Sequence, residues 1–352
     1  MEKGLELEFW VIDGDGNLDT AAPIVEEVER CEPEFVDPLL EIKTPPRDSM
    51  EEIREATEDI LTEALETAKK QEKGLVPLGT TLTPEEIPRL SYPRGDIQAR
   101  VLGERISYAK NVAGTHIHFD QEEVVPQLNL LTALDPALAL TNSSPYYGDR
   151  LASGARTLIY RQRCYEEFPQ HGQLWQYTES REEWERRQEK RFEEFRDAAL
   201  THNIDSRTFS SIFEPGDTIW TPVRLREEFG TVEWRAPDTT LPSQTLKLVE
   251  DVSRLVEQTG EKEVAVEEKA GKTRDKISVP PFDALKTLSA HAVHQGLYAS
   301  DVVDYLEELG FDVGEYLPVS GRIGDEDRIR GKGARRTRKV WAKKLEEDLK
   351  SL

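Results

Sequence analysis

The sequence predicts an α+β fold built around a mainly antiparallel β-sheet, and two observations support this prediction. Stretches typical of strands and of helices are mixed along the chain, without the regular βαβ alternation of a doubly wound fold. Three short stretches, at residues 4–10, 114–119 and 230–235, alternate between apolar side chains and acidic, imidazole or guanidinium side chains. Because side chains two residues apart on a strand point to the same face, each stretch predicts a strand with one apolar and one charged face.

Residues 1–80 are expected to hold three strands and two helices. The first strand ends at the turn sequence Gly14-Asp15-Gly16-Asn17, and Pro45-Pro46 ends the second. A long helix follows, with Asp48 as its N-cap and apolar residues at helical spacing. The strands are expected at residues 4–12, 39–44 and 75–80, and the helices at 21–31 and 48–73.

The remainder is expected to continue this mixed pattern within a single domain of residues 1–352. The segments 81–95 and 142–156 are expected to be loops, and either could close over a site as a lid. Residues 260–280 are expected to form a linker or a hairpin excursion, and residues 320–352 a basic, helical C-terminal segment. Further strands are expected around His116 and at 219–223 and 231–236, and helices at 96–110, 121–141, 179–200, 241–258 and 282–309.

The composition narrows the class of protein. The chain has 69 acidic and 46 basic residues, a formal net charge of −23, which excludes a general nucleic-acid binder. The acids are spread along the chain, which favours a protein of a halophilic archaeon over an acidic mesophilic protein. Cys31 and Cys164 form no CxxC motif and are expected to be free, buried thiols. With no membrane-length apolar run and no signal peptide, a cytoplasmic location is expected.

Four carboxylates stand at the centres of predicted strands, namely Glu6, Glu8, Glu41 and Glu233. A solvated strand edge could explain Glu6 and Glu8 taken alone. Four mid-strand carboxylates together would be costly unless a cation compensates their charge. Carboxylates with one imidazole suit Mg²⁺ or Mn²⁺ better than zinc, which prefers cysteine and histidine. The pattern therefore predicts a metal site on one face of the sheet.

The histidines and arginines near these strands have separate expected roles. His116 follows Gly114-Thr115, where the backbone can approach a ligand closely, and is expected to be a metal ligand, while His118 stays behind it or faces substrate. Arg235 shares a face with Glu233 and could clamp a phosphate with its planar fork or form a salt bridge. Arg156 and Arg161 could bind a carboxylate or a phosphate, or carry solvated charge.

Together, these motifs resemble the glutamate–cysteine ligase family, in particular its carboxylate–amine ligase branch. The stretch Gly4–Trp10 with Asp13–Gly16 is similar to the N-terminal signature of that family, and Glu34–Pro45 to its acidic segment ending in E-x-x-T-P. The other similarities are the G-x-H-x-H strand at Gly114–His118, the N-S-S-P loop at Asn142–Pro145, the G-x-R stretch at Gly154–Arg156, the G-T-V-E-x-R-x-x-D strand at Gly230–Asp238 and, more weakly, the segment Gly331–Arg336. Their order and spacing are kept over nearly the whole chain.

This resemblance implies a glutamine-synthetase-like catalytic domain, in which a curved antiparallel sheet forms a funnel with helices outside. It also implies ATP and two or three Mg²⁺ ions, with Mn²⁺ as an alternative, on the inner face of the sheet. By position, Arg235 is implied to contact ATP phosphate and, with Glu41, to be catalytic. The implied metal ligands are Glu6, Glu8, Glu34, Glu41, His116 and Glu233.

The implied reaction joins the γ-carboxylate of glutamate, activated by ATP as an acyl phosphate, to an amine, with L-cysteine as the leading candidate. Two alternatives stay open: another amine, or a nucleotide- or metabolite-binding protein without turnover. A purely structural acidic protein leaves the mid-strand carboxylates unexplained. The expected partners are small molecules, with a homo-oligomer left open. The basic segment Arg328–Lys339 could close over phosphates or be a solvated tail.

Overall fold

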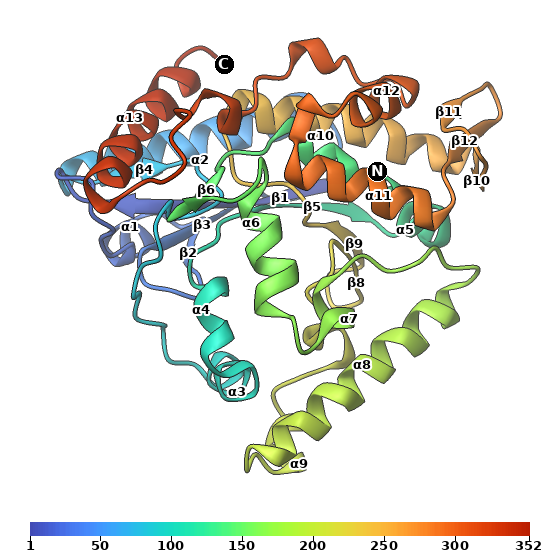
Figure 1. Ribbon diagram of the computed structural model, residues 1–352, viewed down its shortest axis with the longest axis horizontal. Coiled ribbons are helices and arrows are strands. Elements are labelled where there is room, and N and C mark those ends of the chain that lie inside the picture. The colour runs from blue at the N-terminus through green and yellow to red at the C-terminus, as the bar shows by residue number, and fades with distance from the viewer.

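The structure, a computed structural model, describes residues 1–352 and is centred on a seven-stranded sheet (Figure 1). The strand order is β2-β3-β1-β5-β9-β8, with β4 also paired to β1, and all these pairs are antiparallel. The prediction of an α+β fold around an antiparallel sheet is therefore confirmed. The strands are β1 (Lys3–Ile12), β2 (Cys31–Pro33), β3 (Leu39–Lys43), β4 (Gly74–Val76), β5 (Thr115–Asp120), β8 (Val223–Arg226) and β9 (Thr231–Trp234).

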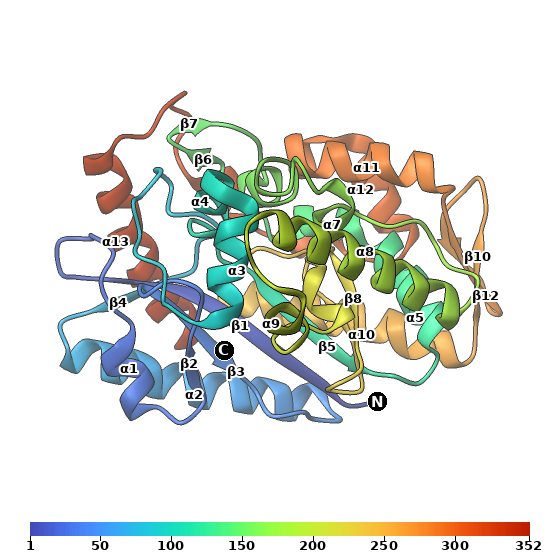
Figure 2. The same ribbon diagram turned by 90° about the horizontal axis from the view of Figure 1, so that it is seen from below.

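Helices cover both faces of this sheet. In Figure 1, α2, α10 and α13 lie on one side of it, and α3, α4, α7, α8 and α9 lie on the other; Figure 2 shows the second group from below. A π-helix, η3 (Leu158–Cys164), follows α6. The helices are α1 (Ala22–Glu27), α2 (Met50–Lys70), α3 (Pro93–Leu102), α4 (Ile106–Ala109), α5 (Val124–Ala133), α6 (Ala155–Thr157), α7 (Pro169–Gly172), α8 (Arg181–Thr201), α9 (Ser206–Ser210), α10 (Pro242–Glu257), α11 (Phe282–His294), α12 (Ser300–Glu308) and α13 (Gly331–Leu349).

The alternation along the strands separates a core from a cavity. Leu5, Leu7 and Val232 point to one face of the sheet and join a core with apolar residues of α2 and α10. A second apolar cluster, formed by residues of α3, η3, α8 and α9, lies on the opposite side of the sheet. The sheet formed by β1, β3, β5 and β9 therefore lies between two apolar clusters, which hold its strands at fixed positions.

Two local predictions were wrong, and each has a physical reason. The N-cap of α2 is Ser49, not Asp48, because Ser49 Oγ accepts from the Glu52 N–H while the Glu52 carboxylate accepts from the Ser49 N–H. The strand expected at 219–223 begins only at Val223. Pro222 precedes it, and a proline cannot donate a ladder hydrogen bond.

The segment at 260–280 forms a small sheet of three strands, β10 (Glu263–Val266), β11 (Gly271–Lys272) and β12 (Lys276–Val279). β10 and β12 are parallel, so the segment is neither a linker nor a simple hairpin. Two further short strands, β6 (Tyr146–Tyr147) and β7 (Asp149–Arg150), pair with each other. None of the helices is both long and apolar enough to cross a membrane.

The basic C-terminal segment is a packed helix rather than a solvated tail. α13 contacts β4, α2 and α10, and its Trp341 and Leu345 side chains are buried. Arg338 is also buried and donates to the main-chain oxygen of Thr81. The helix contributes no residue to the cavity on the charged face of the sheet, which is described in the next section. The expectation that the segment closes over phosphates is therefore not supported.

Candidate active site

The register of the sheet brings together side chains that are far apart in the sequence. Strand β1 lies between β3 and β5, and β5 pairs with β9. Directly opposed positions on neighbouring strands have Cβ atoms only about 5 Å apart, so their side chains interact. Three such pairs join polar residues proposed from the sequence: Glu6 with His116, Glu8 with Glu41, and His118 with Glu233.

One cavity of about 330 Å³ holds almost all of the residues proposed from the sequence. It opens on the charged face of the sheet, and η3 and the segments 92–98 and 220–229 complete its wall. The sequence-predicted residues that line it are Glu6, Glu8, Glu34, Glu41, His116, Arg156, Glu233 and Arg235. Glu34 comes from the turn after β2 rather than from the centre of a strand.

Three overlapping groups of these side chains have the geometry of a cation site. In each group, one possible ligand atom from every member lies within 4.8 Å of the others. The groups are Glu8 with Glu34 and Glu41; Glu6 with Glu41 and His116; and Glu6 with His118 and Glu233. Because Glu6 and Glu41 each belong to two groups, the three form a continuous row across the strands.

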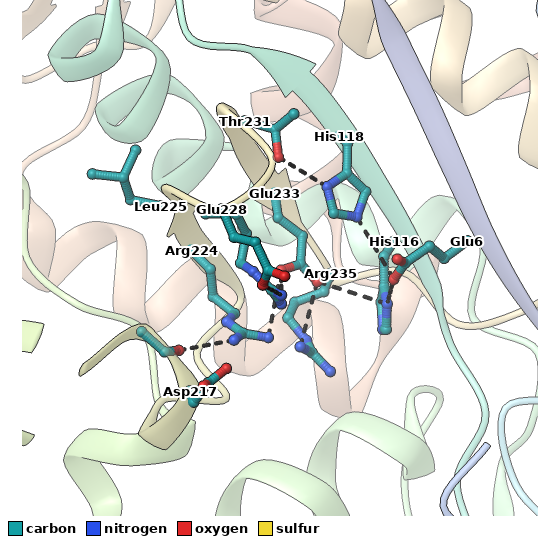
Figure 3. A network of polar contacts seen from close by, with 12 residues as sticks. Glu6, His116, His118, Asp217, Arg224, Leu225, Glu228, Thr231, Glu233 and Arg235 are labelled. Carbon is teal, nitrogen blue, oxygen red and sulfur yellow. Dashed lines mark hydrogen bonds and ion pairs between the residues drawn. The ribbon is translucent and has the colours of Figure 1, made fainter. Parts of the chain in front are cut away.

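The imidazoles hold the carboxylate of Glu6 at the centre of this row. His116 Nδ1 lies 2.9 Å from Glu6 Oε2, and His118 Nε2 lies 3.6 Å from the same atom (Figure 3). Burial alone would raise the pKa of Glu6, but the hydrogen bonds and charges of His116 and His118 hold that pKa below its ordinary value. Burial lowers the pKa of His116 to about 4, so its imidazole is neutral at pH 7, as a metal ligand must be.

Glu8 and Glu41 lack enough positive charge around them. Burial, followed by the neighbouring Glu34 carboxylate, raises the pKa of Glu8 to about 8. Burial and the Glu34 and Glu6 carboxylates raise the pKa of Glu41 well above its ordinary value. A bound cation would reverse both shifts, because it favours the ionised carboxylates.

Arginines surround Glu233 at the other end of the row. Arg224 Nη1 and Arg235 Nη1 lie 3.5 and 3.4 Å from its carboxylate oxygens (Figure 3). Arg226 Nη1 lies 3.7 Å from one of the same oxygens. Burial alone would raise the pKa of Glu233, but the Arg224 and Arg235 guanidinium groups hold it below its ordinary value. Three guanidinium groups beside a row of carboxylates form a site in which phosphate and metal ions can be bound together.

Two buried atoms support the fit of a divalent cation. His116 Nε2 has no hydrogen-bond partner and lies 3.7 Å from Glu8 Oε1, and His118 Nε2, also without a partner, lies 3.6 Å from Glu6 Oε2. Buried polar atoms are normally paired, so atoms of this kind between carboxylates point to a missing ligand. Glutamate oxygens with a single imidazole match the ligand preference of Mg²⁺ or Mn²⁺.

Arg156 lines the cavity and lies against Gly114. Its Nη1 donates to the Ala236 carbonyl at 3.2 Å, and its side chain is buried. A Cβ atom on Gly114 would collide with this guanidinium, which explains why glycine stands there. The Gly114 N–H donates to Glu8 Oε2 at 2.5 Å. Gly114 therefore positions both a cavity arginine and a candidate metal ligand.

Arg161 lies outside the cavity, so the prediction that it binds substrate or nucleotide is not supported. Its two terminal nitrogens each lie 2.9 Å from a carboxylate oxygen of the fully buried Asp135. This forked ion pair ties η3 to the segment after α5. His118 lines a neighbouring cavity of about 530 Å³ and contacts Thr231 Oγ1 at 3.0 Å.

The first residues of the loop at 142–156 are buried and hydrogen-bonded, so this part of the loop cannot act as a lid. Ser143 and Ser144 are fully buried; the Ser143 N–H donates to the Asp238 carboxylate, and Ser144 Oγ lies 2.6 Å from Thr80 Oγ1. The segment 81–95 instead sends Tyr92 to the cavity wall. Of the two lid candidates, only the segment 81–95 reaches the cavity through a side chain, Tyr92, that is not held in a buried hydrogen-bond network.

Several cavity residues were missed by the reasoning from sequence. Arg224 and Arg226 could have been found, because Val223-Arg224-Leu225-Arg226 alternates like the other strands. Tyr160, Tyr165 and Trp220 line the cavity as an aromatic wall; the rings of Tyr165 and Trp220 are stacked, with centroids 4.9 Å apart. Nothing in their local sequence marks them, since η3 and a loop bring them together.

The antiparallel sheet carries an acidic, arginine-lined cavity on one face, and side chains of these kinds can hold metal ions and phosphoryl groups. Residues 2–309 match the model of glutamate-cysteine ligase family 2 (GCS2), so the chain belongs to this family. This membership supports an enzyme of the carboxylate–amine ligase class. No curated protein matches the chain in sequence.

Two solved structures share the fold. A glutamate–cysteine ligase from Francisella tularensis in complex with AMP superposes with a TM-score of 0.61 at 13% identity, covering 100% of this chain and 89% of that chain. A bifunctional glutathione synthetase from Pasteurella multocida gives a TM-score of 0.57 at 16% identity, covering 98% of this chain and 52% of that chain. The present chain thus spans about half the length of the second protein. At these identities the similarity concerns the fold alone.

Proposed function

We propose that the chain is an ATP-dependent ligase that activates the γ-carboxylate of glutamate as an acyl phosphate and couples it to an amine. L-cysteine, which gives γ-glutamylcysteine, is the leading candidate for that amine. The observation that carries the proposal is the row of carboxylate and imidazole groups beside three arginines in one cavity. Membership of the GCS2 family supports the reaction class, and the AMP bound to the Francisella protein supports a nucleotide as substrate.

The proposed metal ligands are the members of that row. Two or three Mg²⁺ ions, or Mn²⁺ in their place, would neutralise phosphate oxygens and the charge that develops during phosphoryl transfer. The ladder of β1, β3, β5 and β9 fixes all of these ligands except Glu34, which comes from the turn after β2, so most of them need little rearrangement. The assigned residues are Glu6, Glu8, Glu34, Glu41, His116 and Glu233.

The arginines are proposed to hold the phosphate chain and the substrate carboxylates. Arg235 has its guanidinium 3.4 Å from Glu233 and faces the cavity, so it can contact a phosphate beside the metal ligands. Arg156 is buried between Gly114 and the Ala236 carbonyl, lines the cavity and can contact a substrate carboxylate or phosphate there. Glu41 and Arg235 are the residues on which phosphoryl transfer is expected to depend most.

The second step sets a demand on the cavity that its walls can meet. The amine nitrogen attacks the acyl carbon, a C–N bond forms as the C–O bond to phosphate breaks, and inorganic phosphate leaves together with a proton from the amine. Water must be kept out, because it would hydrolyse the acyl phosphate. Tyr160, Tyr165 and Trp220 line this cavity, and their rings pack against one another to form an aromatic part of its wall.

We also propose that this enzyme works in the cytoplasm at high salt. The exposed face of α2 carries a ridge of acids, which would self-repel in dilute buffer. The ridge consists of Glu51, Glu52, Glu55, Asp59, Glu63 and Glu66. We expect the thermal midpoint to rise with KCl concentration up to concentrated brine; a midpoint that falls steadily with salt would contradict this part of the proposal.

The test is ADP release with Mg-ATP, L-glutamate and a panel of amines in concentrated KCl. We expect ADP formation that needs glutamate and is greatest with L-cysteine, together with a γ-glutamyl product seen by mass spectrometry. ADP formation that needs glutamate but responds to another amine would replace cysteine and keep the ligase. Nucleotide binding without turnover for any acid and amine would favour the alternative of a non-catalytic binding protein.

A further inference from the structure

Lys43 has a position that neither the motifs nor the proposed reaction explains. It ends β3, where it shares the charged face with Glu41 and lies directly across the ladder from Glu6. Its Nζ atom is 2.9 Å from Glu41 Oε2, 2.8 Å from Glu32 Oε2 and 4.0 Å from Glu6 Oε1. A lysine ammonium therefore touches the row of carboxylates at the two members that each belong to two groups.

Lys43 also marks the junction between two cavities. It lines both the main cavity and the neighbouring one that contains His118, a property it shares only with Glu6 and Phe229. It is the one lysine among the residues of the main cavity, and its side chain is one-third exposed. The ammonium can therefore move between the row and the solvent on its flexible stem.

The charges explain what this ammonium does to a metal ion. Glu41 and Glu6, with His116, form the central group of the row. A positive charge within 4 Å of both carboxylates partly satisfies them and repels a second cation brought to the same oxygens. Glu32 offers Lys43 an exposed second partner, so the ammonium keeps an ion pair when it leaves Glu41.

We propose that Lys43 is a resident cation of the centre: it holds Glu41 and Glu6 together in the absence of metal and weakens divalent-ion binding at the central group. This inference rests on the metal centre of the proposed function, but not on the identity of the amine. Phosphate oxygens of a nucleotide would supply further ligands to a divalent ion at these carboxylates, and Lys43 would then turn toward Glu32. Full metal loading of the centre would in this way depend on the nucleotide.

The experiment measures the binding of Mn²⁺ alone to the full 352-residue chain, from the EPR signal of free Mn²⁺. Lys43→Met removes the charge and should bind Mn²⁺ about tenfold more tightly, or bind one more ion, because a like charge a few ångströms away is gone. Lys43→Arg keeps the charge and should bind like the wild type. Lys69→Met is the matched control, since Lys69 pairs with Glu346 at the surface, far along the chain from the row.

A second variant gives an effect of opposite sign. Glu32→Gln leaves Glu41 as the close partner of Lys43, so the ammonium should stay at the row more of the time. Mn²⁺ binding should therefore weaken in this single variant, which retains Lys43. Most of that weakening should disappear when Glu32→Gln is combined with Lys43→Met, which separates the effect of Lys43 from the simple loss of one acid. Without metal, Lys43→Met should also lower the thermal midpoint, and Mn²⁺ should restore it.

Three outcomes would overturn the inference. The first is Lys43→Met with the stoichiometry and affinity of the wild type. The second is an effect of Glu32→Gln that is unchanged in the Lys43→Met background. The third is the absence of Mn²⁺ binding in the wild type and in every variant, which would reject the metal centre as well. Absence of ligase turnover together with the expected Mn²⁺ results would reject only the proposed reaction.

Discussion

The two faces of the central sheet are built from the same strands but follow opposite rules. On one face, Leu5 and Leu7 of β1 are buried in an apolar cluster with residues of α2 and α10. On the other face, Glu6 and Glu8 of the same strand lie among carboxylates, imidazoles and guanidinium groups. One residue of shift along β1 changes the role of a side chain completely, because the side-chain period of a strand is two.

This difference separates stability from chemistry. The apolar face contributes free energy of unfolding through burial, and its loss leaves cavities. The charged face gains little stability without metal, since the pKa values of Glu8 and Glu41 are raised by burial and by neighbouring carboxylates. Substitutions on the apolar face should therefore lower the free energy of unfolding, and substitutions on the charged face should lower turnover.

The largest effect is expected on the charged face. Glu41→Gln should lower turnover about a thousandfold or more, because it removes a ligand shared by two of the three cation groups. Its free energy of unfolding should stay within about 1 kcal/mol of the wild type, since a poorly compensated charge is lost. ADP release and thermal melts measure the two quantities, with Glu66→Gln on the exposed face of α2 as control. Near-normal turnover in Glu41→Gln would remove the metal assignment.

The opposite failure is expected for Leu7→Ala. The Leu7 side chain is 2% exposed in the core, so its truncation should cost about 2–5 kcal/mol of unfolding free energy. Turnover per folded molecule, measured well below the thermal midpoint, should change by less than a few-fold. Val340→Ala, at an exposed apolar residue of α13, is the control for loss of methyl groups alone. A loss of turnover without a loss of stability would mean that the faces are not independent.

A smaller effect is expected for Arg235→Lys. Lysine keeps the charge but not the planar fork that matches two phosphate oxygens, so turnover should fall about a hundredfold while the fold is kept. Arg328→Lys, at an exposed arginine paired with Asp149, should have no effect. Equal losses in both variants would restore a role for the basic C-terminal segment, and no loss in either would remove the phosphate clamp.

The smallest effect is expected for Gly114→Ala, which tests how the sheet supports the site. The new Cβ must displace the Arg156 guanidinium, so turnover should fall about tenfold with a modest loss of stability. Gly324→Ala is the matched control, because a Cβ there meets no atom within 4 Å. If both glycine variants behave alike, the contact of Gly114 with Arg156 has no functional meaning.

How much could be predicted from the sequence differs between residues. Glu6, His116 and Glu233 could be brought to one face from alternation alone, because a strand fixes the direction of every second side chain. Arg224 carried the same signal but was missed, since the apolar run from Ile219 drew the expected strand a few residues too early. Trp220 could not have been found, because its place in the cavity wall depends on how a loop packs.

Arg161 shows the reverse error. Its sequence context, close after the N-S-S-P loop, made it equal to Arg156 as a candidate ligand. The π-helix η3 turns it away from the cavity toward Asp135, and local sequence does not reveal that turn. Lys43 is two residues from Glu41 on the same strand, so alternation places both on one face. Its proposed role, however, depends on its contacts with Glu6 and Glu32 from two other strands.

The most direct test of the central claim is a crystal structure of the chain with Mn²⁺ and a non-hydrolysable ATP analogue, using the anomalous signal of manganese. We expect manganese peaks at coordination distance from Glu41 and Glu233, with a phosphate group between them and Arg235. Manganese found only at surface acids, with the analogue outside the cavity or absent, would contradict the assignment of this sheet face as a metal and phosphoryl site.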